Sequence, residues 1–245
     1  MDRDEHPRGL RGHPALAPLR GVWSYLRNDW VREAVRLRRL RPANLFQPYS
    51  FTAMDRYPRC FAFARDTLGA DIPLNLLSFG CATGEEAFTL ARYFPQATVK
   101  GIDINARAIA AAKRATPVGD AGRIGFEAAA SAAAEPAGSY DAVFAFAVFR
   151  NSALKHAPPS CDQLLRFADF DRSVSDLARC LKPGGLFFLR HAHFRFADAT
   201  VAGDFELALT LETEPGAEPN PLYGRDDRLI AADANAPEAA WRKLR

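Results

Sequence analysis

From residue 74 onward, short apolar runs alternate with segments of helical periodicity. The apolar runs predict buried strands at 74–79, 97–104, 123–130, 139–149 and 186–194. Between them, apolar residues recur three and four positions apart and predict helices at 84–94, 105–115 and 170–182. Asn105 stands where a residue would cap the second of these helices. Strands that alternate with helices in this way are typical of a parallel sheet covered on both faces.

The end of the chain follows a different pattern. Residues 205–212 alternate between apolar and polar side chains, which predicts an antiparallel edge strand, and residues 239–245 are predicted to return as a last strand. The predicted fold is therefore α/β, with a doubly wound, mostly parallel seven-stranded sheet. We expect a basic arm over 1–20, a helical extension or lid over 21–70, and the main domain over 71–245.

Composition limits the class of protein further. The 245 residues are 48% hydrophobic, enough for one sizeable core, and no run reaches the roughly 18 to 20 apolar residues of a membrane span. The first residues lack the apolar centre of a secretory signal, so we expect a cytoplasmic protein. The four cysteines lie far apart without a CxxC pair, which favours buried free thiols and predicts no metal site.

Arginine is concentrated near the N-terminus. The first 42 residues hold ten arginines against five acids, and WVREAVRLRRLR (30–41) predicts a basic amphipathic helix. A solvated arginine face packed on the main domain is the simpler interpretation. The alternative is a surface that holds nucleic acid or an acidic protein.

The stretch LSFGCATGEEAFTLA (77–91) lies at the carboxyl end of the first predicted strand, where open parallel sheets bind their ligands. Gly80 and Gly84 would let the backbone approach a ligand closely. Glu85 and Glu86 at the start of the helix would repel the phosphates of a nucleotide. S-adenosylmethionine (SAM), which has no phosphate but has a sulfonium and an ammonium group, suits the stretch better.

Asp103 ends the second predicted strand, nineteen residues after Gly84. A carboxylate at the tip of this strand is well placed to accept hydrogen bonds from both ribose hydroxyls. An acid at the N-terminus of the following helix is the alternative role, and the two roles are compatible.

These residues resemble class I SAM-dependent methyltransferases over about residues 50–215. FGCATGEE is similar to their first motif, GID to their second, YDAVFAF to their fourth strand and LKPGG to the turn before the fifth. Ser78 and Ala82 depart from the usual first motif, and Ala130 and Ser131 offer no carboxylate for adenine. The resemblance implies SAM as cofactor and assigns its binding residues: Gly80, Cys81, Ala82, Gly84, Glu85 (for the ammonium), Asp103, Ile104 and Phe146.

Within that class, GCATGEE is most similar to the chemotaxis receptor methyltransferases. TAMDR (52–56) also resembles their TxFFR segment, which implies that Arg56 meets the cofactor's carboxylate. The fourth strand departs from the pattern, because AFAV (145–148) stands where that type has CRNV. We therefore expect the cofactor site of that type but not its receptor substrate.

Methyl transfer needs few obligatory side chains, because the sulfonium already activates the methyl group. The candidates for a catalytic base follow the fourth and fifth strands: Asn151, His191 and His193. The two histidines lie two apart on a predicted strand and would face the same way. We expect a methyltransferase with a small-molecule acceptor. The alternatives are a macromolecule (protein carboxyl or RNA) methyltransferase and a protein that binds SAM without transferring the methyl group.

Overall fold

The computed structural model describes residues 29–40, 42, 44–48, 52–212, 220–234 and 236–245. The chain divides into two compact units, residues 1–40 and 41–245. The described part of the first unit is helix α2 (Asp29–Leu40), which confirms the helix predicted at 30–41. The predicted arm over 1–20 lies outside the described residues, and the role of 21–70 as a lid stays a prediction.

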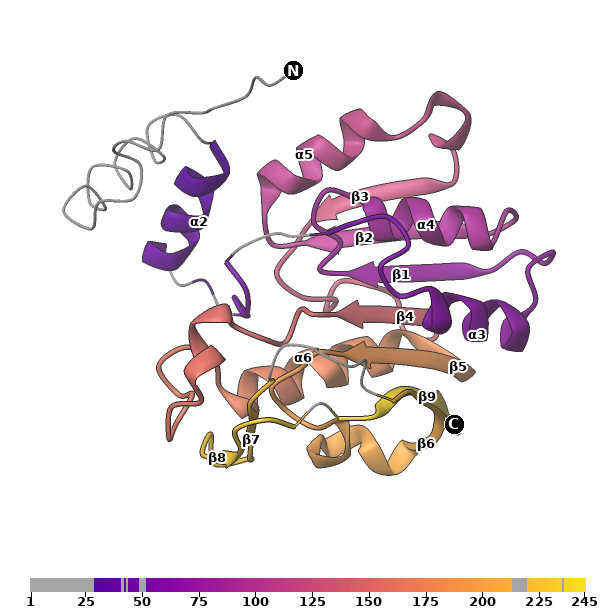
Figure 1. Ribbon diagram of the computed structural model, residues 1–245. Coiled ribbons are helices and arrows are strands. Elements are labelled where there is room, and N and C mark those ends of the chain that lie inside the picture. Colours follow the sequence, from indigo (N-terminus) through magenta and orange to yellow (C-terminus); the bar gives the residue numbers. More distant parts are fainter. Residues whose placement is uncertain (1–28, 41, 43, 49–51, 213–219, 235) are drawn as a thin grey trace, which may run out of the picture. The chain divides into compact units, whose positions relative to one another are not determined.

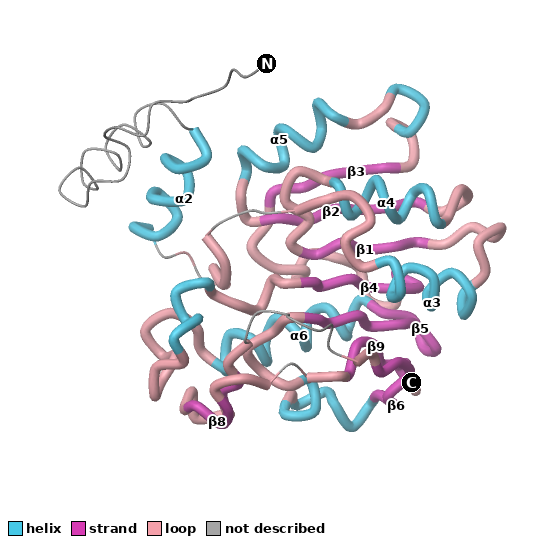
Figure 2. The backbone as a smooth tube through the Cα atoms, in the orientation of Figure 1, coloured by secondary structure: helices cyan, strands magenta, loops and turns pink. Residues whose placement is uncertain are grey.

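The second unit is built on a seven-stranded sheet with the strand order β3-β2-β1-β4-β5-β9-β6 (Figures 1 and 2). Its strands are β1 (Asn75–Phe79), β2 (Thr98–Asp103), β3 (Ile124–Ala128), β4 (Tyr140–Phe146), β5 (Leu181–Arg190), β6 (Phe205–Thr210) and β9 (Glu238–Lys243). Strands β1 to β5 pair in parallel, whereas β9 pairs antiparallel with both β5 and β6. The predicted fold class is confirmed, including the antiparallel last strand.

Helices cover both faces of this sheet. On one face, α3 (Pro58–Leu68), α4 (Glu85–Tyr93) and α5 (Ala106–Ala115) pack against the sheet and form one hydrophobic core. On the other face, α6 (Phe167–Cys180) packs against the sheet and forms a second core. In Figure 1, α3 and α4 lie in front of the sheet and α6 lies behind it. Helix α3 falls within the segment predicted as an extension, yet its Phe61 and Ala64 are buried in the same core as α4.

The residues that precede two of the helices explain where these helices begin. The side chain of Asn105 accepts hydrogen bonds from the backbone N–H groups of Arg107 and Ala108, so the predicted cap of α5 is confirmed. Helix α4 follows Gly84, whose φ of 97° lies in the left-handed region. Glycine adopts this conformation without steric cost, and the chain turns there from β1 into the helix.

Two predicted strands end earlier than the sequence pattern indicates. Strand β4 ends at Phe146 and β5 at Arg190, and the next residues, Ala147 and His191, have φ angles of 56° and 53°. The chain therefore leaves the sheet at both points. Because His191 and His193 follow the end of β5, the prediction that they share one face of a strand is wrong.

The remaining elements are short. A two-stranded hairpin of β7 (Leu222–Tyr223) and β8 (Leu229–Ala231) forms a separate small sheet that the sequence pattern did not predict. Short 3-10 helices occupy Val118–Asp120, Ser152–His156, Phe196–Asp198 and Thr200–Asp204. In the part of the chain that the structure describes, no helix is long and apolar enough to cross a membrane. All four cysteines are buried and free, as predicted.

The ring of Phe126 on β3 lies against two glycines of the sequence motifs. A Cβ atom added to Gly84 would lie 2.8 Å from Phe126 Cζ, and one added to Gly101 would lie 2.6 Å from Phe126 Cδ1 and 2.8 Å from Cys81 Sγ. Phe126 is itself buried and packs edge-on against Phe88 of α4. The glycines of GID and of the first motif therefore make room for the same aromatic ring.

We predict that Gly101→Ala lowers the free energy of unfolding by about 1–3 kcal/mol, because the new methyl group overlaps Phe126 and Cys81. Gly125→Ala on the neighbouring strand is the matched control, since its added Cβ would meet nothing within 4 Å. Urea denaturation of both variants measures the difference. Equal stability of the two variants would contradict the packing described above.

Candidate functional site

The loop between β1 and α4 is held against the end of β2 by backbone hydrogen bonds. The N–H groups of Gly80 and Cys81 both donate to the carbonyl oxygen of Ile102, at 2.7 and 3.1 Å. Gly80 has a φ of 75°, and a Cβ atom there would lie 2.3 Å from Cγ2 of Val148. The loop thus needs glycine at this position for both its backbone conformation and its close approach to the segment after β4.

Asp103 connects this loop to the start of α5. Its Oδ2 accepts a hydrogen bond from Ala82 N at 2.8 Å, and its Oδ1 accepts one from Asn105 N at 2.7 Å. Burial raises the pKa of the Asp103 carboxyl, while the two backbone hydrogen bonds act in the opposite direction. Each oxygen keeps a second lone pair, so the carboxylate can still accept hydrogen bonds from a ligand.

A pocket, here called the large lobe, opens beside this carboxylate and comprises about 590 Å³ of empty space that includes open solvent. Gly80, Ala82, Asp103, Ile104 and Phe146 from the predicted cofactor set all line it. Its other walls are Asn44, Phe46, Gln47, Phe79, Ala129, Ala130, Ala147 and Val148. The Oε1 atom of Gln47 is buried and receives no hydrogen bond from the described residues, so an acceptor is available in this wall.

A second pocket, here called the small lobe, adjoins the first, because Gly80 and Phe146 line both. It comprises about 330 Å³ of empty space that includes open solvent, and its walls are Thr52, Ala53, Arg56, Tyr57, Phe61, Gly80, Glu86 and Phe146. The predicted cofactor residue Arg56 therefore lies at the small lobe. Of the remaining predicted cofactor residues, Cys81 and Gly84 are buried within the loop and line neither lobe.

The two glutamates of the motif have different surroundings. Glu85 accepts a hydrogen bond from the Thr83 hydroxyl at 2.6 Å and lines neither lobe. Glu86 lines the small lobe and accepts a hydrogen bond from Ser78 Oγ at 2.7 Å. Burial raises the pKa of Glu86 to about 8, although the Ser78 hydrogen bond and the charge of Arg56 oppose this shift. Glu86, rather than Glu85, therefore offers a carboxyl group to a ligand.

Tyr57 closes one side of the small lobe. Its ring packs against Phe146 with centroids 4.2 Å apart, and its hydroxyl is buried without a hydrogen-bond partner in the described structure. Burial raises its pKa to about 12, so the hydroxyl keeps its proton at neutral pH. A buried hydroxyl without a partner is costly, and a ligand acceptor in this lobe would satisfy it.

Asn151 and His193, two of the predicted catalytic residues, are engaged with the backbone. The Asn151 side chain donates to Phe46 O at 3.0 Å and accepts from Ala153 N at 3.1 Å. The ring nitrogens of His193 lie 2.8 Å from Pro221 O and 3.3 Å from Asn151 O. Both side chains are buried and line neither lobe, so their geometry favours a structural role.

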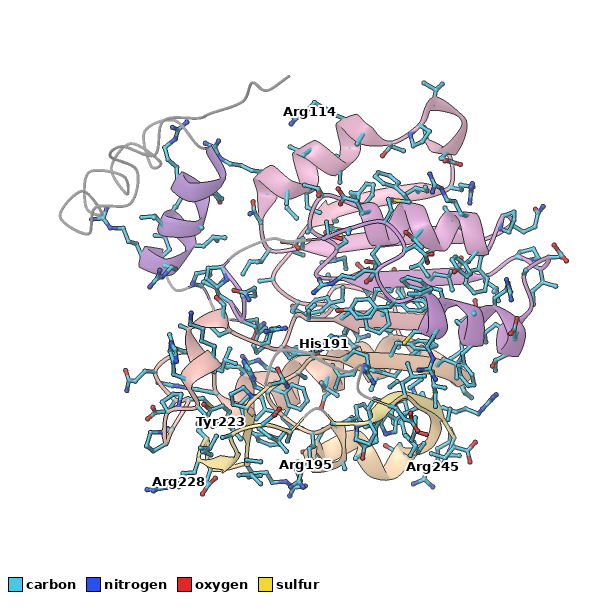
Figure 3. All side chains as sticks on the ribbon, in the orientation of Figure 1. Arg114, His191, Arg195, Tyr223, Arg228 and Arg245 are labelled. Carbon is cyan, nitrogen blue, oxygen red and sulfur yellow. The ribbon has the colours of Figure 1, made fainter. Side chains whose placement is uncertain are left out.

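His191 has a different environment. It is half-buried, no described residue forms a hydrogen bond with its ring, and the ring centroid lies 5.6 Å from that of Tyr57. Burial lowers its pKa to about 4, and the charges of Arg190, Arg150 and Arg56 act in the same direction. In Figure 3 it lies beside the carboxyl ends of β4 and β5. At neutral pH His191 is therefore an uncharged imidazole at the ligand-binding end of the sheet.

Comparison with known proteins supports one part of the resemblance. Residues 77–187, from β1 into β5, match a family model described as a methyltransferase domain. No curated protein sequence matches the chain. Residues 77–187 are therefore similar to a methyltransferase domain, over less than half of the chain. The match includes the β1–α4 loop and Asp103 but does not extend to the chemotaxis receptor type.

Several solved structures are similar to parts of the chain. They include the (4+2)-cyclase SpnF, with 23% identity, a TM-score of 0.41 and coverage of 54% of this chain and 43% of that chain. Geranyl diphosphate C-methyltransferase from Streptomyces coelicolor shows 18% identity, a TM-score of 0.40 and coverage of 54% and 44%. Phosphoethanolamine N-methyltransferase 2 from Haemonchus contortus shows 18% identity and a TM-score of 0.41, with coverage of 68% of this chain and 32% of that chain. The chain thus spans less than half the length of each of these proteins.

The residues whose role in the site was missed by sequence reasoning include Gln47, Tyr57 and Glu86, which line the lobes, and Ser78, which donates a hydrogen bond to Glu86. The signal for Ser78 was present, because a hydroxyl within a mainly apolar strand needs a partner when it is buried. The choice of Glu86 over Glu85 could not be made from two adjacent glutamates. Gln47 and Tyr57 lie outside the sheet pattern and reach the site only through the tertiary fold.

The raised pKa of Glu86 predicts a pH-dependent stability. The unfolded chain loses this proton near its ordinary pKa of 4.5, whereas the folded protein keeps it until about pH 8. The contribution of Glu86 is therefore fully present below about pH 4.5 and is lost as the pH rises to about 8. We predict that Glu86→Gln, which keeps an acceptor for Ser78, flattens this part of the curve.

Urea denaturation of both proteins between pH 5 and 9 measures the effect. The free energy of unfolding of the unmodified protein should fall relative to that of Glu86→Gln across this range. Curves that run parallel would show that Glu86 titrates normally.

Proposed function

We propose that this protein binds SAM and transfers its methyl group to a small-molecule acceptor. One observation carries the proposal: the FGCATGEE loop borders two adjoining lobes that present a carboxylate (Asp103), a partly buried carboxyl group (Glu86) and an arginine (Arg56). A ribose, an ammonium and a carboxylate are the complementary groups of SAM. The match of residues 77–187 to a methyltransferase domain supports the same function.

The adenosine part would occupy the large lobe. Asp103 would accept hydrogen bonds from the ribose hydroxyls through lone pairs that the backbone bonds leave open. Ile104 and Ala129 would supply apolar walls, and Gln47 Oε1 would accept a hydrogen bond from the adenine amino group. Such an acceptor would take the place of the carboxylate that is missing after β3.

The methionine part would occupy the small lobe. Arg56 and the Tyr57 hydroxyl would meet its carboxylate, and Glu86 would take the role that the first motif assigned to Glu85. Cys81 and Gly84 would act indirectly by shaping the loop. The resemblance to chemotaxis receptor methyltransferases enters the proposal only for this cofactor site.

In the transfer step, a lone pair of the acceptor would form a bond to the methyl carbon while the C–S bond breaks and its electron pair stays on sulfur. The cofactor then leaves as S-adenosylhomocysteine (SAH). The methylated acceptor must also lose its proton. Of the three predicted bases we propose that His191 takes this proton, because its imidazole is neutral at pH 7 and no described residue forms a hydrogen bond with it. A cytoplasmic location also belongs to this proposal, since four buried free thiols suit a reducing compartment.

Two alternatives follow from particular features. The arginines of α2 would favour a macromolecular substrate such as RNA or an acidic protein, whose association would weaken steeply with salt. The apolar end of β4, with Phe146 and Ala147 in place of polar residues, would favour a protein that binds SAM without transfer.

The cofactor proposal predicts that SAH binds saturably in isothermal titration calorimetry and that NAD does not. Arg56→Ala should weaken SAH binding about tenfold or more, because an arginine–carboxylate hydrogen bond is lost. Arg59→Ala, which removes another exposed arginine three positions away, is the matched control and should bind as tightly as the unmodified protein. Absence of SAH binding, or equal binding by both variants, would overturn the assignment.

If Glu86 meets the ammonium group of the ligand, SAH binding should also change the protonation of Glu86. At pH 7 a carboxyl group with a pKa of about 8 is mostly protonated, and a ligand ammonium beside it would favour the ionised form. We predict that SAH binding releases close to one proton, so the observed enthalpy should depend on the ionisation enthalpy of the buffer. Glu86→Gln should abolish that dependence. Equal buffer dependence in the two proteins would exclude Glu86 as the ammonium partner.

A further inference from the structure

A third cavity lies beyond β5 and shares no wall residue with the two lobes. We call it the β5–β9 cavity, and it comprises about 770 Å³ of empty space that includes open solvent. Its walls come from the end of β5, the segment that follows it, β6, β9 and the residues Asn220 and Ala236. Figure 3 labels Arg195, one of its wall residues, together with His191.

Asn220 gives this cavity a hydrogen-bond acceptor. The side chain is only 4% exposed, and its Nδ2 donates to Ala192 O at 2.7 Å. This bond fixes the orientation of the amide group, so Oδ1 points away from Ala192. The Oδ1 atom is buried, and no described residue donates to it. A buried acceptor without a donor is rare in folded proteins, and a ligand N–H or O–H would satisfy it.

The rest of the wall is mainly apolar and aromatic. Phe196 and Trp241 stack with centroids 4.4 Å apart, and Phe194, Leu189 and Leu207 complete the apolar surface. The charged wall residues are Arg190, Arg195 and Glu238, each at least partly exposed. Walls of this composition suit a flat, mainly apolar molecule whose single donor group reaches Asn220.

His191 links this cavity to the proposed cofactor site. Its side chain is a wall of the β5–β9 cavity, and its ring lies 5.6 Å from that of Tyr57, a wall of the small lobe. The segments that follow β4 and β5 are joined at this point, because Ala147 N donates to Arg190 O at 2.9 Å. A ligand in the cavity would thus have the neutral imidazole between it and the small lobe.

We propose that the β5–β9 cavity is a separate ligand site, which binds a planar and mainly apolar small molecule that donates a hydrogen bond to Asn220 Oδ1. This inference goes beyond the proposed methyltransferase function, because the cavity shares no wall residue with the two lobes. Asn220 acts in it as a specificity residue, because it distinguishes molecules with a donor from molecules of the same shape without one.

The test uses 2-naphthol and 2-methoxynaphthalene as probes, which share a flat apolar body and differ in the donor. Their binding to the full chain is measured by ligand-observed NMR titration in the presence of saturating SAH. We expect 2-naphthol to bind at least fivefold more tightly than 2-methoxynaphthalene, because only the former satisfies Asn220. Asn220→Leu should remove this preference.

A second pair of variants tests the proposal even if Asn220→Leu does not fold. Ala236 is an exposed wall residue of the cavity, and Ala236→Trp should weaken 2-naphthol binding at least tenfold by occupying the space. Ala121→Trp makes the same change at an exposed alanine that lines none of the three cavities, and it should bind like the unmodified protein. Equal binding by both tryptophan variants, or no binding of 2-naphthol at all, would overturn the proposal.

Calorimetry with SAH on the same proteins distinguishes this inference from the proposed function. If SAH binds and the binding of 2-naphthol does not depend on Asn220 or Ala236, the ligand site in the β5–β9 cavity is wrong while the cofactor assignment stands. If SAH fails to bind but 2-naphthol, titrated alone, binds with the predicted preference, the methyltransferase function is wrong while the ligand site stands.

Discussion

The carboxylate of Asp103 holds together the parts of the molecule on which the site depends. One oxygen accepts from Ala82 in the β1–α4 loop, and the other accepts from Asn105, the cap of α5. Two loops that follow neighbouring parallel strands are thereby joined at the carboxyl end of the sheet. The protein keeps a buried acid there whose pKa is raised by burial, and the two backbone hydrogen bonds partly offset that cost.

Backbone strain is concentrated around this point. Three alanine or histidine residues near the ends of β1, β4 and β5, namely Ala82, Ala147 and His191, have positive φ angles between 48° and 56°. Residues other than glycine rarely adopt this region, and such conformations gather at functional sites when the surrounding structure enforces them. Here they turn the chain away from the sheet sharply enough to leave cavities at the strand ends. Ala82 and Ala147 line the large lobe, and His191 lines the β5–β9 cavity.

Electrostatics distinguish the cavities from one another. The small lobe pairs an arginine with a carboxyl group that is largely protonated when no ligand is bound, so its charge can respond to an incoming ammonium. His191, between the small lobe and the β5–β9 cavity, remains neutral because burial and three nearby arginines all disfavour its charged form. The neutral imidazole keeps a free lone pair at physiological pH, although its lowered pKa makes it a weaker base than an ordinary histidine. The aromatic rings of Tyr57 and Phe146 keep the boundary between these regions apolar.

The order of strands and helices, the antiparallel last strand, the cap at Asn105 and the glycine-rich loop at the end of β1 were all predictable from the sequence. They depend on short-range rules: apolar periodicity, the φ angles open to glycine, and side chains that bond to nearby backbone. The pairing of Ser78 with Glu86, the contacts of Tyr57 and Gln47, the backbone bonds of His193 and the position of Asn220 were not predictable. Each of these features joins residues that are distant along the chain or requires a choice between adjacent side chains. The periodicity of the sequence does not show which of these side chains faces a cavity in the folded protein.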